Sequence, residues 1–164
     1  MKRKATKEKS LSQALAKDIA NVCQKEADLT FEDIVKSYRM IERTHLARVS
    51  DNQFYALETR RRVAERLVYA AIDKNRPWEE VRSLLDNLFR LGFTNILVKV
   101  LVLQISSKYC LQIGRNNEGI TLLAPLETEL ETELSRKDQR APTKRFYSSE
   151  LENIRALLNK LRAS

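Results

Sequence analysis

The sequence predicts an all-α protein of about six to seven helices. Glycine occurs only three times in 164 residues, and apolar residues recur three and four positions apart along most of the chain. Only one segment has a composition that would also suit a β-strand, and no second strand exists to pair with it. Few glycines indicate few and simple turns. Short connections favour antiparallel neighbours, so we expect an antiparallel bundle or a short stack of helical hairpins.

Residues 1–9 are predicted to form a disordered basic arm. They contain five lysine and arginine residues and one glutamate, which gives them half of the formal net charge of +8. No long apolar run follows them, so they do not have the pattern of a secretory signal. We therefore expect a single helical domain over residues 10–164, preceded by this arm.

The first two helices are expected from apolar stripes that begin directly after capping residues. Ser10 can cap a helix whose stripe runs over residues 11–23. Thr30 begins the second, which has acidic residues in its first turn, where the positive end of the helix dipole favours them. Its stripe covers residues 31–49 and includes the only histidine of the chain.

The third and fourth helices have equally clear boundaries. Ser50 or Asp51 is expected to cap a helix that runs to about Asn75. Pro77 then stands in the first turn of the fourth helix, and Gly92 ends it, which matches the preference for proline at helix starts and glycine beyond helix ends.

The remaining helices lie around one strongly apolar segment. Thr94 can cap a fifth helix whose residues 96–105 are apolar on nearly every side, as in a helix surrounded by others. A sixth is expected over residues 116–135, although Pro125 either kinks it or marks the first turn of a shorter helix. Residues 136–147 are predicted to form a basic loop before a last helix that starts at Ser148 or Ser149.

One stretch around the second glycine has a further pattern, carried by Gly114, Arg115, Glu118, Gly119, Ile120 and Leu123. It resembles the turn and second helix of a tetratricopeptide repeat, although Tyr109 stands one residue too far from the glycine and Leu126 replaces the usual alanine. Residues 75–84 are similar to residues 114–123 at an offset of 39, whereas that family repeats at about 34 residues. The resemblance implies stacked hairpins and carries over no binding residues.

The arginine triplet of the third helix is the first candidate for an anion or nucleic-acid contact. With Leu57 as the reference, Arg60 falls inside the apolar arc of the helix and Arg61 falls on its edge, followed by Arg62. A guanidinium at such a position needs a carboxylate, an anion or solvent. The plainer interpretation is that the stem of Arg60 packs while its head reaches the boundary or pairs internally.

The predicted basic loop is the second candidate for contacts with nucleic acid, because single strands bind positive charge beside flat rings. Its candidate residues are Arg136, Lys137, Arg140, Lys144, Arg145, Phe146 and Tyr147. The alternative is that the loop is merely basic and that the two rings pack on the last helix.

The residue types that catalysis needs are scarce in this chain. His45 has neither a second histidine nor a cysteine at metal-ligand spacing, so we expect a hydrogen-bonded histidine at the edge of the core. We expect no cofactor, no metal and no enzymatic activity. Cys23 and Cys110 are expected to be thiols of a cytoplasmic protein. The longest apolar run, residues 93–105, is shorter than the roughly 20 residues that span a membrane.

These observations favour a non-catalytic helical module that binds another protein. The alternative is a nucleic-acid-binding protein or a small helical subunit of a ribonucleoprotein, in which the arm, the arginine triplet and the 136–147 segment contact phosphates. The leucine-rich stripe of the last helix also suggests a homodimer.

Overall fold

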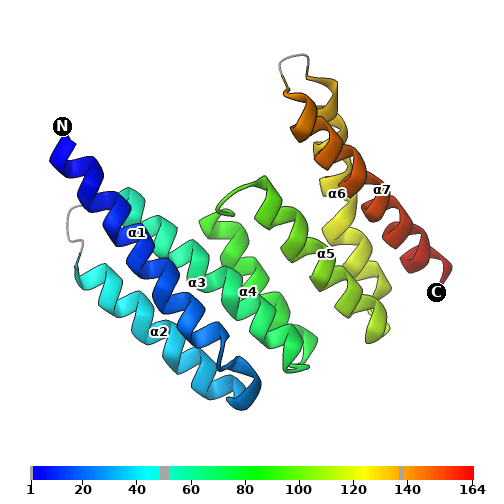
Figure 1. The fold of residues 1–164 in the computed structure, drawn as a ribbon. Coiled ribbons are helices and arrows are strands. Elements are labelled where there is room, and N and C mark those ends of the chain that lie inside the picture. The colour runs from blue at the N-terminus through cyan, green and yellow to red at the C-terminus, as the bar shows by residue number, and fades with distance from the viewer. Residues whose placement is uncertain (1, 49–51, 137–138) are drawn as a thin grey trace. The chain divides into compact units, whose positions relative to one another are not determined.

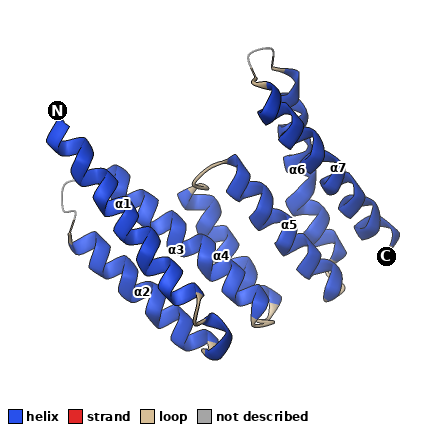
Figure 2. Cartoon of the chain, viewed as in Figure 1, coloured by secondary structure: helices blue, strands red, loops and turns tan. Residues whose placement is uncertain are grey.

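The computed structural model describes residues 2–48, 52–136 and 139–164, and within these ranges the regular structure is helical, with no strand (Figure 2). The elements are α1 (Lys2–Cys23), the short 3₁₀ helix η1 (Glu26–Asp28), α2 (Phe31–Ala47), α3 (Gln53–Asp73), α4 (Trp78–Leu91), α5 (Ile96–Gln112), α6 (Asn116–Ser135) and α7 (Ala141–Ala163). The all-α prediction is confirmed, including the helical assignment of the valine-rich segment in α5.

The chain divides into two compact units, Met1–Thr94 (unit 1) and Asn95–Ser164 (unit 2), and each is described by itself. In unit 1, α3 packs against α2 and α4, while α1 packs against α2 and α3. In unit 2, α6 packs against both α5 and α7. Successive helices of each unit run in opposite directions (Figure 1), which confirms the antiparallel hairpins. The single domain over residues 10–164 stays a prediction.

The first helix is longer than the sequence analysis expects. It begins at Lys2 rather than at Ser10, so residues 2–9 have helical backbone where we expected a disordered arm. This stretch contains no glycine or proline, and nothing in it interrupts a helix that continues into residues 11–23. Disorder of the arm in solution stays a prediction.

The loop predicted over residues 136–147 is wrong for most of its length. The last helix, α7, begins at Ala141, because Pro142 stands in its first turn, where the fixed φ of proline suits a helix and its missing N–H costs no hydrogen bond. Arg140 has extended backbone and precedes the helix. One candidate residue of the expected loop, Lys137, lies outside the described residues.

Two capping predictions can be compared directly with the structure. The Thr30 side chain accepts a hydrogen bond from the Asp33 N–H at 3.2 Å and caps α2 as expected. The N-terminus of α5 is capped by Asn95, whose Oδ1 accepts from the Val98 N–H at 3.0 Å, and not by Thr94. Ser50 and Asp51 lie outside the described residues.

Close packing in unit 2 depends on one glycine inside α6. A Cβ at Gly119 would lie 2.9 Å from a methyl group of Leu161 in α7 and 3.2 Å from the Cβ of Cys110 in α5. The hydroxyl of Ser107 in α5 also donates to the carbonyl of Gly119 at 3.2 Å. Gly119 therefore lets the three helices of this unit approach one another closely.

A charged network joins η1, α2 and α3 in unit 1. Arg66 donates through Nη2 to both carboxylate oxygens of Glu26, at 3.0 and 2.9 Å. The hydroxyl of Tyr38 donates to the same carboxylate, and the Sγ of Cys23 lies 3.2 Å from that hydroxyl. Burial raises the pKa of Tyr38 above its usual value. Cys23 and Cys110 are thiols outside any disulfide, as predicted.

Candidate functional site

The three consecutive arginines of α3 have three different environments. Arg61 donates through Nε to the carbonyl of Leu91 in α4 at 2.7 Å. Arg62 pairs with Glu58, one helical turn earlier, at 2.6 Å. Arg60 is exposed and makes no hydrogen bond or ion pair with any residue that the structure describes. Of these three arginines, Arg60 is therefore the one whose guanidinium is available to a ligand.

Arg60 has the predicted position on the apolar side of α3. Ala64, Leu67 and Ala71, which flank Arg60 on the helical wheel, are all buried. The predicted position of Arg60 within the apolar arc agrees with the burial of these residues, although the arginine side chain itself is exposed. Its head reaches solvent, as in the plainer interpretation.

The 136–147 segment does not form a basic loop with exposed rings. Arg136 pairs with Glu133 at 2.9 Å. Tyr147 is buried, and Phe146 is half-buried with its ring centroid 5.7 Å from that of Tyr147. Three basic side chains of this segment make no bond with described residues, namely those of Arg140, Lys144 and Arg145. The combination expected for a single strand, charge beside open aromatic faces, is thus not brought together among the described residues.

A groove in unit 1 brings together residues of α2, α3 and α4. Its volume is about 330 Å³. It is lined by Arg39 and Glu42 of α2, by Arg60, Ala64 and Leu67 of α3, and by Ser83, Leu84, Asn87, Arg90 and Leu91 of α4. Each helix supplies residues that recur every three or four positions, with two adjacent pairs in α4, so each presents a single face to the groove. We call this site the arginine groove.

The arginine groove has an excess of positive charge. Arg39 is neutralised by Glu42, whose carboxylate lies 2.8 Å away. Arg90 is exposed and, like Arg60, has no bonded partner among the described residues. Ser83 and Asn87 add a hydroxyl and an amide, while the leucines and Ala64 supply apolar surface. This combination can bind a negatively charged group attached to an apolar one.

Most of the groove could not be identified from the sequence. Arg60 was singled out by its position on the helix, but Arg39, Ser83, Asn87 and Arg90 stood out in no pattern. The groove residues come from three helices that are distant in sequence, and no local spacing marks them as neighbours.

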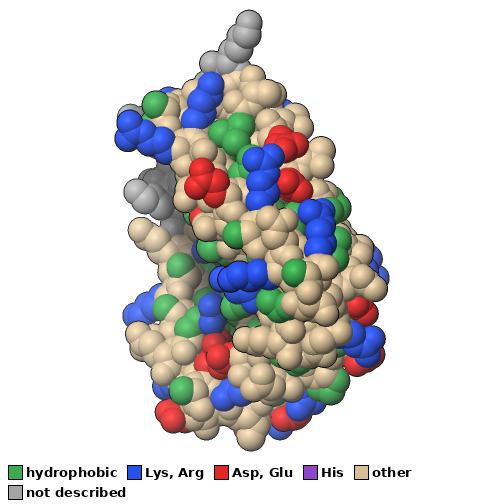
Figure 3. Space-filling view, turned by 90° about the vertical axis from the view of Figure 1, so that its right-hand side faces the viewer, with side chains coloured by type: hydrophobic (Ala, Val, Ile, Leu, Met, Phe, Trp, Pro, Cys, Tyr) green, Lys and Arg blue, Asp and Glu red, His purple; other side chains and the backbone are tan. Residues whose placement is uncertain are grey.

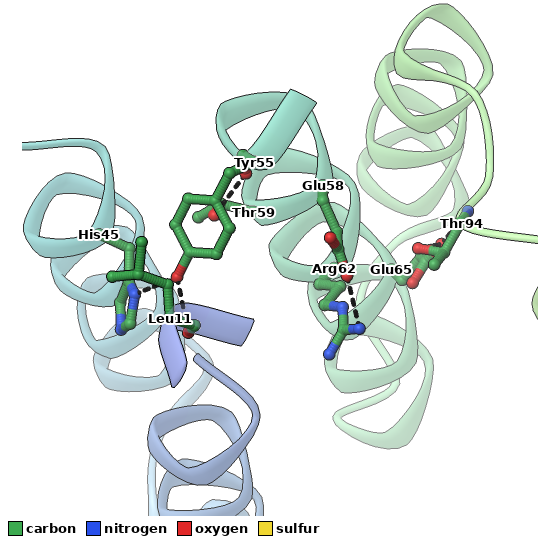
Figure 4. A network of polar contacts seen from close by, with 8 residues as sticks. All are labelled: Leu11, His45, Tyr55, Glu58, Thr59, Arg62, Glu65 and Thr94. Atoms are coloured by element: carbon green, nitrogen blue, oxygen red, sulfur yellow. Dashed lines mark hydrogen bonds and ion pairs between the residues drawn. The ribbon is translucent and has the colours of Figure 1, made fainter. Parts of the chain in front are cut away.

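His45 belongs to a buried polar network beside α1, α2 and α3 (Figure 4). Its Nδ1 lies 2.8 Å from the hydroxyl of Tyr55, and its Nε2 lies 2.9 Å from Oδ2 of Asp18. The Tyr55 hydroxyl donates to the carbonyl of Leu11 at 2.9 Å. Both ring nitrogens of this fully buried side chain have partners, which confirms the predicted hydrogen-bonded core histidine.

A second polar contact in unit 1 joins Glu65 of α3 to Thr94, which follows α4 in the chain. The carboxylate of Glu65, which is 6% exposed, accepts hydrogen bonds from the backbone N–H and the hydroxyl of Thr94, both at 2.8 Å (Figure 4). A buried carboxylate is stable only with such partners. Glu65 therefore serves the packing of α3 against the chain that follows α4.

The acidic side chains of α6 are engaged inside unit 2. Arg155 of α7 binds both Glu127 and Glu131, and Lys99 of α5 binds Glu129. The apolar stripe of α7 that suggested a dimer is buried in this unit, with Leu151, Ile154, Leu158 and Leu161 all less than one tenth exposed. On the face shown in Figure 3, acidic and basic side chains lie among one another.

Comparison with known proteins identifies no relative. No protein-family model, no curated protein and no solved structure matches this chain. Among the described residues, no three histidine, cysteine or acidic side chains are grouped so that they could hold a metal ion. None of the helices described here is both long enough and apolar enough to cross a bilayer.

Proposed function

We propose that this chain is a non-catalytic helical module that binds another protein through the arginine groove of unit 1. The observation that carries the proposal is the pair Arg60 and Arg90, which line one groove and have no partner there among the described residues. Arginine is enriched at protein interfaces and among the residues that dominate binding energy, because its guanidinium forms several directed hydrogen bonds. We expect the module to act in the cytoplasm, where its two cysteines would remain reduced.

The alternative, nucleic-acid binding, has less support in the arrangement of basic residues. Arg61, Arg62 and Arg136 are occupied by internal partners, and Tyr147 is buried. Glu42 also lines the arginine groove, and its ion pair with Arg39 leaves that guanidinium less available to a phosphate backbone. Protein binding is therefore the better-supported function.

Affinity capture from extracts of the native host tests the proposal. The bait is the full chain, compared with the double variant Arg60→Glu/Arg90→Glu and with the control Arg82→Gln. Arg82 lies on α4 outside the groove and pairs with the exposed Asp86, so its loss is expected to change stability by less than about 1 kcal/mol. We expect wild type and control to retain the same protein at near-equal amounts, and the double variant to lose it.

The same retained proteins with all three baits would contradict the proposal. Binding of a random single-stranded oligonucleotide at low salt, steeply weakened by added salt and by the double substitution, would instead support the alternative. The captured protein could also be a second copy of this chain. Sedimentation of the purified chain tests that case, because it distinguishes a monomer from a dimer by molecular mass.

A further inference from the structure

The arginine groove differs in its electrostatics from the other arginine sites of unit 1. Several guanidinium groups elsewhere have carboxylates of their own: Arg62 with Glu58, Arg66 with Glu26, and Arg76 with Glu80. Arg43 and Arg48 have no carboxylate among the described residues, but they do not line the groove. In the groove, two guanidinium groups from different helices have none. A carboxylate bound between them would form charge-assisted hydrogen bonds to both, which are about twice as strong as neutral ones.

The backbone beside the two free arginines is joined by their immediate neighbours in sequence. Arg61, directly after Arg60, donates to the carbonyl of Leu91, directly after Arg90. This bond fastens the C-terminal end of α4 to the middle of α3 beside the groove. Gly92 permits it, because a Cβ there would lie 3.0 Å from Nη2 of Arg61 and its φ is +75°. The backbone that carries both free arginines is thus ordered before a ligand binds, which lowers the entropy cost of binding.

The remainder of the groove selects the rest of the ligand. Leu84 and Leu91 are half-buried and offer apolar surface next to the guanidinium groups. A volume of about 330 Å³ accepts a few side chains and not a folded domain. Faces of three neighbouring helices line the groove, and such grooves bind the apolar face of a short helix. Because Arg39 is paired with Glu42, two guanidinium groups of the groove remain for a ligand, which suits a single carboxylate better than a continuous polyanion.

We propose that the arginine groove binds an acidic amphipathic helix of a partner protein, with one Asp or Glu carboxylate between Arg60 and Arg90 and neighbouring apolar side chains on Leu84 and Leu91. This inference rests on the proposed function and adds the chemistry of the partner segment. Asn87 stands between these residues on α4 and can donate to the same carboxylate.

Selection from a library of random peptides tests this chemistry. Peptides several helical turns long are selected on the full chain and then depleted on the Arg60→Glu/Arg90→Glu variant. We expect the remaining peptides to be enriched in Asp and Glu, with leucine-like residues three or four positions from them. The strongest peptide is then titrated by fluorescence anisotropy.

Four variants give the expected pattern in that titration. Arg60→Gln and Arg90→Gln each weaken binding by about tenfold, the usual effect of losing a charged hydrogen bond. Ser83→Asp, which places a carboxylate in the groove, weakens it by a similar factor. The control Arg82→Gln changes the dissociation constant by less than about twofold. A matched peptide with glutamine in place of glutamate binds as weakly to wild type as the acidic peptide binds to Arg60→Gln.

The possible failures of the two proposals can be told apart. Groove-dependent peptides without acidic enrichment would overturn the acidic-helix inference and leave the protein-binding function intact. The absence of any groove-dependent peptide would overturn the inference, and together with groove-independent capture from extracts it would overturn the proposed function as well. An oligonucleotide that displaces the acidic peptide and outbinds it at low salt would replace the inference with the nucleic-acid alternative.

Discussion

At the scale of single residues, the hydroxyl of Tyr55 joins three helices of unit 1. It donates to the carbonyl of Leu11 in α1 and lies within hydrogen-bond distance of His45 in α2. Tyr55→Phe leaves the Leu11 carbonyl and a ring nitrogen of His45 without this partner in a buried site. We expect the free energy of unfolding at neutral pH to fall by about 1–3 kcal/mol, measured by urea denaturation.

Tyr69→Phe is the matched control for this substitution. The Tyr69 hydroxyl makes no hydrogen bond with a described residue, and its ring lies beneath the guanidinium of Arg66, 5.5 Å from ring centroid to Cζ. Removing the Tyr69 hydroxyl while keeping the ring is expected to change the free energy of unfolding by less than about 0.5 kcal/mol. Equal losses for the two substitutions would mean that the Tyr55 network adds no stability of its own.

At the scale of helices, Gly119 lies where three helices of unit 2 pack closely. Valine at this position would place its methyl groups against Leu161 and Cys110, whose atoms already lie within 3.2 Å of an ideal Cβ. We expect Gly119→Val to lower the free energy of unfolding by about 2–3 kcal/mol, because overpacking forces the helices apart. The control Thr121→Val adds the same β-branched residue on the exposed side of α6 and should cost less than about 0.5 kcal/mol. Similar losses of unfolding free energy for Gly119→Val and Thr121→Val would show that α7 can move away from α6 without destabilising the unit.

Pro125 gives a second prediction for the same helix. The structure keeps α6 continuous from Asn116 to Ser135 with this proline in its interior, so the prediction of a shorter helix starting there is wrong. Its side chain is exposed, and its ring nitrogen cannot donate to the preceding turn. Pro125→Ala restores a donor and a residue of high helix propensity, and it should raise the free energy of unfolding by about 1–2 kcal/mol. A lower denaturation midpoint would instead indicate that the ring of Pro125 stabilises the packing of α6.

At the scale of the whole molecule, buried tyrosines make stability depend on alkaline pH. Burial raises the pKa of Tyr38, Tyr55 and Tyr69 above the usual value of 10.0. The unfolded chain therefore loses these protons at a lower pH than the folded chain does. The stabilising contribution is complete below about pH 10 and is lost as the pH rises through the folded-state pKa values.

We accordingly expect the free energy of unfolding to fall as the pH rises above about 10. Tyr38→Phe removes one of the titrating groups and should reduce the slope of this fall, as urea denaturation at several pH values would measure. A slope that this substitution leaves unchanged would assign the alkaline loss of stability to other groups.

Most helix positions follow from residues that are close in sequence. The 3.6-residue spacing of apolar side chains, the cap at Thr30 and the glycines after α4 and α5 are local features, and the helices lie where these features predict them. Besides the early start of α1 and the Asn95 cap of α5, the errors occurred at proline, which suits both a loop and the first turn of a helix. Pro142 begins α7 where a loop was expected, because the preceding residues alone do not distinguish the two.

The chain's local pattern thus accounts for an all-α fold and for a hydrogen-bonded histidine in its core. It could not identify which arginine is free for a ligand, because the partners of Arg61 and Arg66 are 30 and 40 residues away. Packing of α2, α3 and α4 decided that Arg61 would be occupied and that Arg60 would meet Arg90 in one groove. Hydrogen bonds between distant residues depend on how helices pack, and that information is spread over the whole unit.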